Sequence, residues 1–281
     1  MVRKISSSQL KSQLRQAVNK QKQAINNYNQ AVRKYNQAVR TYNSRVRANK
    51  QRLNNELAKL KRQSSSTRYT LFKSSVYTLH SAYVKLEAKS DGELLGPQYD
   101  EILDLSEKEN ANSLEVMNAL LCDDAEVEED SAPLQHTLIT NELKTISGEL
   151  NDRWKGAIFS LSPRNPDAAR HFCTSAREIF TQILEIKAPD DKVITLMPSC
   201  DKTDQGKPTR RAKIRYLLHQ KGMTEASLED FVEQDMDNIV QLFTVFNDGT
   251  HGSAGKFDLQ KLYSIKKRVE DGIVFLSQIC V

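Results

Sequence analysis

Hydrophobic residues recur at a strict seven-residue spacing through the first quarter of the chain. From Ser6 to about Gln63 there is no glycine or proline, and two rows of apolar and aromatic residues run side by side. The first row comprises Val18, Ile25, Val32, Val39, Val46, Leu53 and Leu60, and the second comprises Leu14, Gln21, Tyr28, Tyr35 and Tyr42. A sustained period of 3.5 residues predicts a left-handed coiled coil. We expect it to cover residues 1–63, and a helix of that length is roughly 85 Å long.

Apolar residues at helical spacing continue through the rest of the chain in shorter segments. Two of these segments predict a helical hairpin over residues 64–122. The acidic stretch 123–133 predicts a linker, and residues 134–281 predict a C-terminal helical domain. Strand signals are nearly absent. The sequence therefore predicts an all-α fold, in which a long N-terminal coiled-coil helix is followed by a helical bundle.

Within the C-terminal domain, residue types that begin or interrupt helices mark the boundaries. Asn165 followed by Pro166 predicts a helix start, and the pattern continues to about Lys187. Residues 189–207 are rich in Pro, Asp and Lys and predict a loop. A short basic amphipathic helix is expected from Pro208 onward.

Three glycines surround His251 between the last two helical patterns, residues 227–243 and 257–279. A tight connection at the start of a helix exposes backbone N–H groups, and its electrostatic potential favours an anion such as phosphate. The sequence thus indicates an anion site within residues 246–255. The alternative is that the glycines only turn the chain and that His251 only caps a helix.

Charge is distributed unevenly along the chain. Residues 1–68 contain 17 Lys or Arg and one acidic residue, whereas residues 91–130 contain 14 acidic residues and one Lys. The remaining residues from 131 onward hold 20 of each sign. This asymmetry favours a polyanionic partner, such as nucleic acid, for residues 1–63, which we call the basic arm. The alternative is that the basic arm and the acidic segment neutralise one another, within a protomer or between protomers.

The basic arm has almost no acidic residue with which to form ion pairs across the seam of a coiled coil. Two copies side by side repel one another unless an anion or an acidic surface compensates. Basic side chains interspersed with Tyr, Asn and Gln suit sequence-independent contact with phosphates. We therefore expect a homo-oligomer that forms through the coiled coil and binds RNA or DNA, with Arg33, Arg40 and Arg47 among the phosphate ligands. The acidic surface of a partner protein is the alternative.

Several classes of protein are disfavoured by features that the sequence lacks. There is no apolar run typical of a signal peptide and no stretch of 18 apolar residues, so we expect no membrane association. The four cysteines are scattered, which indicates reduced thiols in a cytoplasmic protein. No phosphate-binding loop, nucleophile elbow or zinc-ligand spacing is found. The carboxylates near Asp235 indicate a solvated helix face, so no metal and no cofactor are expected.

Four sequence blocks, within about residues 140–281, resemble a known family. They are Trp154-Lys-Gly-Ala, Asn165-Pro-Asp-Ala-Ala-Arg-His-Phe, Pro208-Thr-Arg-Arg-Ala-Lys-Ile and Phe246-Asn-Asp-Gly-Thr-His-Gly-Ser-Ala-Gly. In this order they resemble the predicted nuclease family associated with prokaryotic PIWI-like proteins, which is found among anti-phage defence genes. The resemblance implies a nuclease or effector subunit of a prokaryotic defence system, together with a partner protein from the same operon.

A second, looser resemblance is to HEPN-type helical bundles. Abortive-infection C-terminal domains carry an Asn, Gly and His-Gly element before their last helix, and Asn247, Gly249, His251 and Gly252 are similar to it. The HEPN ribonuclease motif also needs an Arg four to six residues before the His, where this chain has Val245, Phe246 and Asn247. The resemblance therefore requires an Arg from another helix, namely Arg170, Arg177, Arg210 or Arg211.

These residues can be assigned roles in a metal-independent ribonuclease. His251 can act as base or acid because the pKa of a histidine lies near neutrality. Guanidinium groups hold a scissile phosphate well. The catalytic candidates are His251, Asn247, Arg210, Arg211 and Arg170, and the substrate-binding candidates are Gly249, Gly252, Lys213 and Arg177. His171 is a reserve base or a structural residue. The competing hypothesis is a non-catalytic coiled-coil adaptor that docks a partner of a defence complex.

Overall fold

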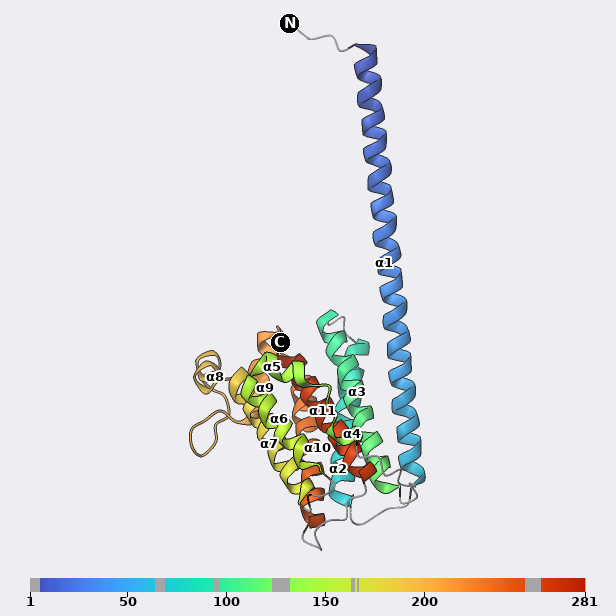
Figure 1. Cartoon of the computed structure of the whole chain (residues 1–281). Helices are drawn as coiled ribbons and strands as arrows, with labels where there is room; N and C mark the ends of the chain where they lie inside the picture. The colour runs from blue at the N-terminus through green and yellow to red at the C-terminus, as the bar shows by residue number, and fades with distance from the viewer. Residues whose placement is uncertain are drawn as a thin grey trace. The chain divides into compact units, whose positions relative to one another are not determined.

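The computed structural model describes most of the chain, and the regular elements of the described part are helices apart from one isolated β-bridge. The all-α prediction is thus confirmed (Figure 1). The described residues are 6–63, 69–92, 97–122, 132–162, 165, 167–250 and 259–280. The helices are α1 (Ser7–Arg62), α2 (Thr70–Gly92), α3 (Pro97–Leu121), α4 (Ala132–Gln135), α5 (Thr140–Ile146), α6 (Gly148–Ser160), α7 (Ala168–Lys187), α8 (Asp190–Leu196), α9 (Arg210–Gln220), α10 (Ala226–Thr250) and α11 (Leu259–Cys280).

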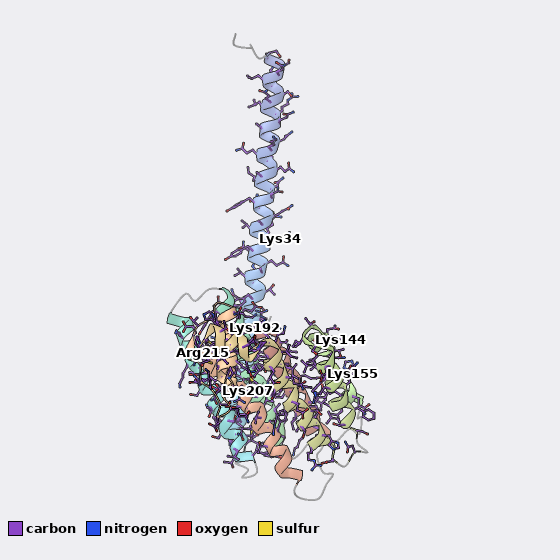
Figure 2. All side chains as sticks on the ribbon, turned by 90° about the vertical axis from the view of Figure 1, so that its left-hand side faces the viewer. Lys34, Lys144, Lys155, Lys192, Lys207 and Arg215 are labelled. Carbon is purple, nitrogen blue, oxygen red and sulfur yellow. The ribbon has the colours of Figure 1, made fainter. Side chains whose placement is uncertain are left out.

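The chain divides into two compact units, Met1–Lys50 and Gln51–Val281. The first unit consists of most of α1, which runs without interruption from Ser7 to Arg62 as its lack of Gly and Pro predicts. Its seven-residue rows are open to solvent, since Ile25 is 52% exposed and Tyr28 is 70% exposed. Figure 2 shows side chains projecting from all sides of this helix. The long helix is confirmed, and its pairing into a coiled coil stays a prediction.

The second unit is a layered bundle. Helices α10 and α11 lie between α7 on one side and α2 with α3 on the other (Figure 1). Helix α6 covers α7, and α9 packs against α7, α10 and α11. The apolar stripes that the sequence pattern predicts are buried here, including Phe172, Ile179 and Phe243. Trp154 of α6 is also fully buried, and its ring lies 5.7 Å from that of Phe172.

The last turns of α1 belong to this bundle and bind α3. Leu53 and Leu60 are buried, although earlier members of the same row are exposed. Asn118 of α3 donates hydrogen bonds to the carboxylate of Glu56 at 2.7 Å and to its backbone carbonyl at 3.0 Å. Arg52 donates to Asn112 at 2.7 Å. The aliphatic row of α1 therefore continues directly into the core of the second unit.

A buried ion cluster joins α3, α10 and α11. Arg268 of α11 is 1% exposed, and it donates hydrogen bonds to Glu109 at 2.7 Å and to Ser113 at 3.0 Å and pairs with Asp235. Burial raises the pKa of Glu109 to about 8, although the Arg268 guanidinium acts in the opposite direction. Burial likewise raises the pKa of Asp235 and of Asp271. Deep inside the bundle, the single guanidinium of Arg268 thus lies among three carboxyl groups, and it cannot neutralise all of them.

The structure differs from the sequence predictions in three places. Helix α8 lies within residues 189–207, which we predicted to be a loop. Helix α10 continues through Thr250, so the predicted turn does not begin at Phe246. The hairpin of α2 and α3 packs closely on α10 and α11, and both belong to one compact unit with the predicted C-terminal domain. The acidic stretch 123–133 therefore does not separate two compact units.

Two further features bear on chemistry. All four cysteines are free, and burial raises the pKa of Cys173 to about 12. Among the described helices, none is both long enough and apolar enough to cross a bilayer.

Candidate nucleic-acid site

Helix α7 supplies one wall of the candidate site. Asn165 fixes its start, because the side-chain oxygen of Asn165 accepts a hydrogen bond from the backbone N–H of Asp167 at 3.1 Å. The stripe of α7 that contains Phe172, Ile179 and Phe180 is buried against the bundle. Arg177 lies on an exposed part of the helix, in the turn before Phe180. The burial of the apolar stripe therefore sets which side chains α7 presents at its edge.

A tight loop before α9 supplies a second wall. The backbone N–H of Thr203 donates to the carbonyl of Lys207 at 2.7 Å, and Gly206 between them has a φ of 76°. That left-handed conformation favours glycine. Thr209 then caps α9, because its side chain accepts a hydrogen bond from the N–H of Ala212 at 3.2 Å. These contacts fix Lys207 beside the first turn of α9.

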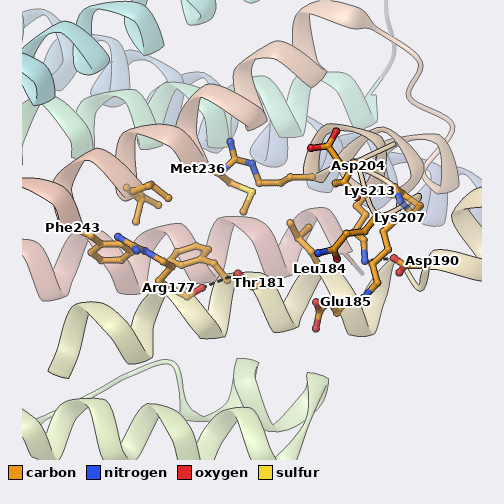
Figure 3. Close-up of a pocket in the computed structure, with 17 residues that line it drawn as sticks. Arg177, Thr181, Leu184, Glu185, Asp190, Asp204, Lys207, Lys213, Met236 and Phe243 are labelled. Atoms are coloured by element: carbon orange, nitrogen blue, oxygen red, sulfur yellow. Dashed lines mark hydrogen bonds and ion pairs between the residues drawn. The ribbon is translucent and has the colours of Figure 1, made fainter. Parts of the chain in front are cut away.

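Together with α10, these elements enclose a pocket with a volume of about 490 Å³, which we call the α7–α9–α10 pocket. Such a volume lies within the range of small-ligand sites, about 300–1,000 Å³. Its basic side chains are Arg177, Lys207, Arg210 and Lys213, and its acidic ones are Glu185, Asp190 and Asp204. Figure 3 shows Arg177 near Phe243 at one end of the pocket, and Lys207, Lys213 and Asp190 at the other.

The four cations of the pocket differ in how far they are neutralised. Lys213 is buried and lies 2.6 Å from Asp190, and Arg210 pairs with Asp237 of α10. Neither Arg177 nor Lys207 forms an ion pair with any other described residue. The Nε of Arg210 is also buried and has no hydrogen-bond acceptor within the described part of the chain. The pocket therefore retains capacity to bind an anion at both ends.

The apolar side chains that line the pocket are buried against one another. Phe243 is fully buried and Ile239 is 1% exposed, so neither offers a free face to a ligand. Base stacking on aromatic rings, which many single-strand binders use, needs an accessible ring. The α7–α9–α10 pocket is therefore better suited to phosphates held by its charged rim than to the reading of a base.

Arg211 lies outside the residues that line this pocket. It donates hydrogen bonds to Glu229 and to Glu233 of α10, each at 2.7 Å, and also pairs with Asp230. Arg215 adds a bidentate pair with Glu229 at 2.8 Å. Burial tends to raise the pKa of Glu229, but the two guanidinium groups hold it below its usual value. In this structure Arg211 cross-links α9 to α10.

Arg170 and His171 lie together near the start of α7. Asp167 forms an ion pair with Arg170 at 2.8 Å, and its carboxylate oxygen lies 3.5 Å from Nε2 of His171. The side-chain nitrogen of Asn165 lies 3.5 Å from Nδ1 of the same imidazole. All of these groups are at least partly exposed, and none of them lines the α7–α9–α10 pocket. The structure thus groups the reserve histidine with Arg170, separately from Arg177.

The remaining candidates lie near the end of α10 or on α1. The backbone at Asn247 and Gly249 belongs to α10, so these residues lie within a helix, and not in the predicted turn. His251 and Gly252 lie outside the described residues. The arginines of the basic arm, which are Arg33, Arg40 and Arg47, are exposed on α1.

The sequence pattern did not identify Lys207, Asp190 or Asp237 as part of a site. The sequence predicts a loop at Lys207 and a solvated helix face near Asp237. The only local signal is that Lys207 directly precedes Pro208 and the basic start of α9. The structure also provides no group of three or more His, Cys, Asp or Glu side chains arranged for a metal ion within the described residues.

Comparison with known proteins finds a family match for the part of the chain that holds this pocket. Residues 143–276 match the model of a protein family described as "Predicted pPIWI-associating nuclease". The match extends from α5 into α11 and includes every residue that lines the pocket, whereas α1, α2 and α3 lie outside it. No curated protein and no solved structure matches the chain. The resemblance expected from the sequence blocks is therefore confirmed, and over residues 143–276 the chain matches the predicted pPIWI-associating nuclease family.

Proposed function

We propose that the protein is a nuclease effector whose C-terminal bundle holds a nucleic-acid backbone at the α7–α9–α10 pocket. The observation that carries the proposal is a pair of cations, Arg177 and Lys207, which have no carboxylate partner among the described residues and lie at opposite ends of that pocket (Figure 3). Arg210, which also lines the pocket, contributes a buried N–H that has no acceptor within the described part of the chain. Phosphates are the natural ligands of guanidinium and ammonium groups in such a setting. The family match supports nuclease activity in general.

His251 is the proposed proton-transfer residue. It follows directly after Thr250, the last residue of α10, and Phe243 of the same helix lines the pocket. In RNA, a base takes the proton of the ribose 2′-OH, and that oxygen then attacks the adjacent phosphorus. The bond to the 5′-oxygen breaks, and this oxygen takes up a proton as it leaves. Arg177, Lys207 and Arg210 hold the phosphates of the bound backbone and stabilise their charge during this step.

The assay uses labelled RNA and DNA of one sequence, with and without EDTA, and the full-length protein. We expect RNA cleavage that resists EDTA and that falls at least about 100-fold in a folded His251→Ala variant. His171→Ala is the matched control, because His171 lies outside the pocket, and it retains activity. Cleavage of DNA, or loss of cleavage in EDTA, contradicts the 2′-OH mechanism. Full activity of His251→Ala contradicts the assigned base.

The family description and the charge of the basic arm support a proposal about the biological setting. We propose that the protein acts with a PIWI-like partner in a prokaryotic anti-phage system, in the cytoplasm. The basic arm assembles the protein and binds nucleic acid in this proposal. Co-purification of the protein with the product of a neighbouring PIWI-like gene is the direct test, and a stable complex is the expected result.

A non-catalytic adaptor is the second candidate function. The observation in its favour is that three predicted nucleic-acid ligands already have carboxylate partners, since Arg210, Arg211 and Lys213 form ion pairs with α10 or α8. In the adaptor, these pairs only stabilise the bundle. Substrate that stays uncleaved in the presence of the PIWI-like partner, together with stable binding of that partner, supports this candidate over the nuclease.

A further inference from the structure

The exposed part of α1 has different chemistry on opposite sides. The aliphatic row from Val18 to Val46 and the second row from Leu14 to Tyr42 form one side, which we call the seam. Two further rows flank the seam, one of alanine and one of asparagine. The alanine row comprises Ala17, Ala24, Ala31 and Ala38, and the asparagine row comprises Asn29, Asn36 and Asn43. In a coiled coil these flanking positions face the partner helix and usually carry its ion pairs.

Charge lies away from the seam in its central part. Between Ala24 and Asn43 the only charged residues are Arg33, Lys34 and Arg40, and all three occupy the two positions that follow the aliphatic row. Those positions face away from a partner helix. Arg47 extends the same row as Arg33 and Arg40, at the same seven-residue spacing. Over residues 24–43 the repulsion expected from the high positive charge is therefore weak at the seam, because the flanking positions there are neutral, whereas Arg15, Lys22 and Arg45 occupy flanking positions nearer the two ends.

The same seam already packs against a helix farther along α1. Upstream, four aliphatic members of the seam are 37–52% exposed, namely Val18, Ile25, Val32 and Val39. Downstream, Leu53 and Leu60 of the same row are at most 5% exposed in the second unit. Glu56, which continues the second row, is bound by Asn118 of α3. From residue 51 onward the seam is thus occupied by the chain itself, whereas upstream its aliphatic row from Val18 to Val39 is open to solvent.

We infer that residues 14–46 pair with a second copy of this chain as a parallel, two-stranded coiled coil. The aliphatic row from Val18 to Val46 holds only β-branched Val and Ile, and the second row holds none. Segregation of β-branched residues to one row favours two parallel strands, in which like rows face one another. The row of Arg33, Arg40 and Arg47 then lies on the outer side of each helix. Phosphates bind there without opening the seam.

This inference deepens the assembly part of the proposed function, and it does not depend on whether the bundle is a nuclease. It fixes the partner, the number of strands and their direction. In this arrangement the basic arm can both dimerise and bind phosphates, because a second protein helix and a phosphate chain use opposite sides of α1.

Cysteine cross-linking of the full-length protein tests the geometry. In a parallel pair, residue 32 of one chain faces residue 32 of the other within disulfide range. Val32→Cys is therefore expected to give a disulfide-linked dimer under mild oxidation. Arg33→Cys, one residue later on the outer side, is the matched control and gives no more dimer than the unsubstituted protein. Equal cross-linking of both variants, or none in Val32→Cys, overturns the inference.

Mass measurement by light scattering tests the strand number and the separation of faces. The unsubstituted protein is expected at twice the chain mass, and Val32→Asp with Val39→Asp at the chain mass. Replacing Arg33, Arg40 and Arg47 by Gln is expected to leave the dimer intact and to weaken binding of a single-stranded oligonucleotide. A monomeric or trimeric unsubstituted protein, or a dimer that dissociates when the oligonucleotide binds, overturns the inference. A nuclease assay that shows no cleavage contradicts only the proposed function.

Discussion

Gly272 is the point at which α11 comes closest to its neighbours. A Cβ atom at this position meets the Cδ1 of Ile239 far inside normal contact distance. It also lies 3.2 Å from Cζ of Phe180 and 3.3 Å from a guanidinium nitrogen of Arg268. All three neighbours are buried, so they cannot move into solvent to make room. Gly272 thus allows α10, α7 and the buried ion cluster to meet at one place.

Gly272→Ala is expected to lower the free energy of unfolding by about 1–3 kcal/mol, which is the usual cost of overpacking a core. Urea unfolding followed by far-UV circular dichroism measures this change. Gly156→Ala is the matched control, since nothing lies within 4 Å of its added Cβ. In a helix interior that control gains about 0.5–1 kcal/mol. Equal stability of the two variants contradicts the close approach at Gly272.

The buried carboxylate of Glu109 makes stability depend on pH. Its pKa is about 8 in the folded protein and near the ordinary value of about 4.3 in the unfolded chain. The stabilisation from the protonated group is complete below about pH 4 and is lost as pH rises through about 8. Glu109→Gln cannot ionise and is expected to reduce the fall in unfolding free energy between pH 6 and 8.5. Glu101→Gln, on an exposed part of the same helix, leaves that fall unchanged. A steeper fall in Glu109→Gln contradicts this assignment.

This buried cluster could not be read from the sequence. The sequence indicated a solvated helix face around Asp235, and Arg268, which binds both Asp235 and Glu109, is 159 residues from Glu109. A carboxylate is tolerated in the core only when a cation reaches it. Which cation reaches it depends on the tertiary packing of α11 against α3. Local patterns of apolar residues hold no information on that pairing.

Among the helices, α9 shows how a short element is fixed in place. It has only 11 residues, so its stability depends on its cap and on packing. Thr209 caps it, and Ile214, Leu217 and Leu218 are buried. Arg210 and Lys213 of the α7–α9–α10 pocket are both carried by this helix. The cap of α9 therefore contributes to the geometry of the candidate site.

Thr209→Ala is expected to lower the free energy of unfolding by about 1 kcal/mol, because the N–H of Ala212 loses its acceptor. Thr209→Ser keeps the hydroxyl and is expected to retain most of the stability. Chemical denaturation of both variants gives the comparison. If Thr209→Ser is destabilised as much as Thr209→Ala, the hydroxyl is not the group that matters.

Most helices were predictable because each carries its own apolar period and its own boundary residues. The C-terminal ends of α1 and α7 lie within one residue of the predicted positions. Helix α8 was missed because it has seven residues, too few to show a period, in a segment rich in Pro and Asp. The end of α10 was misplaced because Asn247 and Gly249 have low helix propensity, and the preceding helix nonetheless extends over them.

Across the whole molecule, the strongest charge feature is the basic arm. Ten Lys or Arg and no acidic residue lie between Ser7 and Lys50. If this surface binds nucleic acid, each phosphate contact adds about 0.7–0.9 to the slope of log affinity against log salt concentration. The combined substitution of Arg33, Arg40 and Arg47 by Gln is therefore expected to reduce the slope by about 2–3.

Fluorescence anisotropy with a labelled single-stranded oligonucleotide at several salt concentrations measures this slope. Replacing Lys144 and Lys155, which Figure 2 labels on other helices, by Gln is the control for nonspecific loss of charge. An unchanged slope in the arginine variant shows that the basic arm serves assembly alone.

The candidate site was only partly predictable, since it combines three chain segments. Arg177, Arg210 and Lys213 were identified as basic residues on helices, and the structure brings them to one pocket. Arg170 and Arg211 looked equivalent to them in the sequence, but the structure pairs both with carboxylates outside that pocket. Lys207 became apparent only through the loop that holds it beside α9. Proximity between segments, and not residue type, decides membership of the site.

The central claim is that a nuclease acts on a backbone held by the α7–α9–α10 pocket. The most direct measurement is the rate of RNA cleavage by the Arg177→Gln/Lys207→Gln variant beside the Lys144→Gln/Lys155→Gln variant, which removes equal charge elsewhere. We expect the pocket variant to lose at least about 100-fold in cleavage rate, as expected when transition-state contacts are removed, and the control to cleave like the unsubstituted protein. Equal cleavage by both variants contradicts the claim.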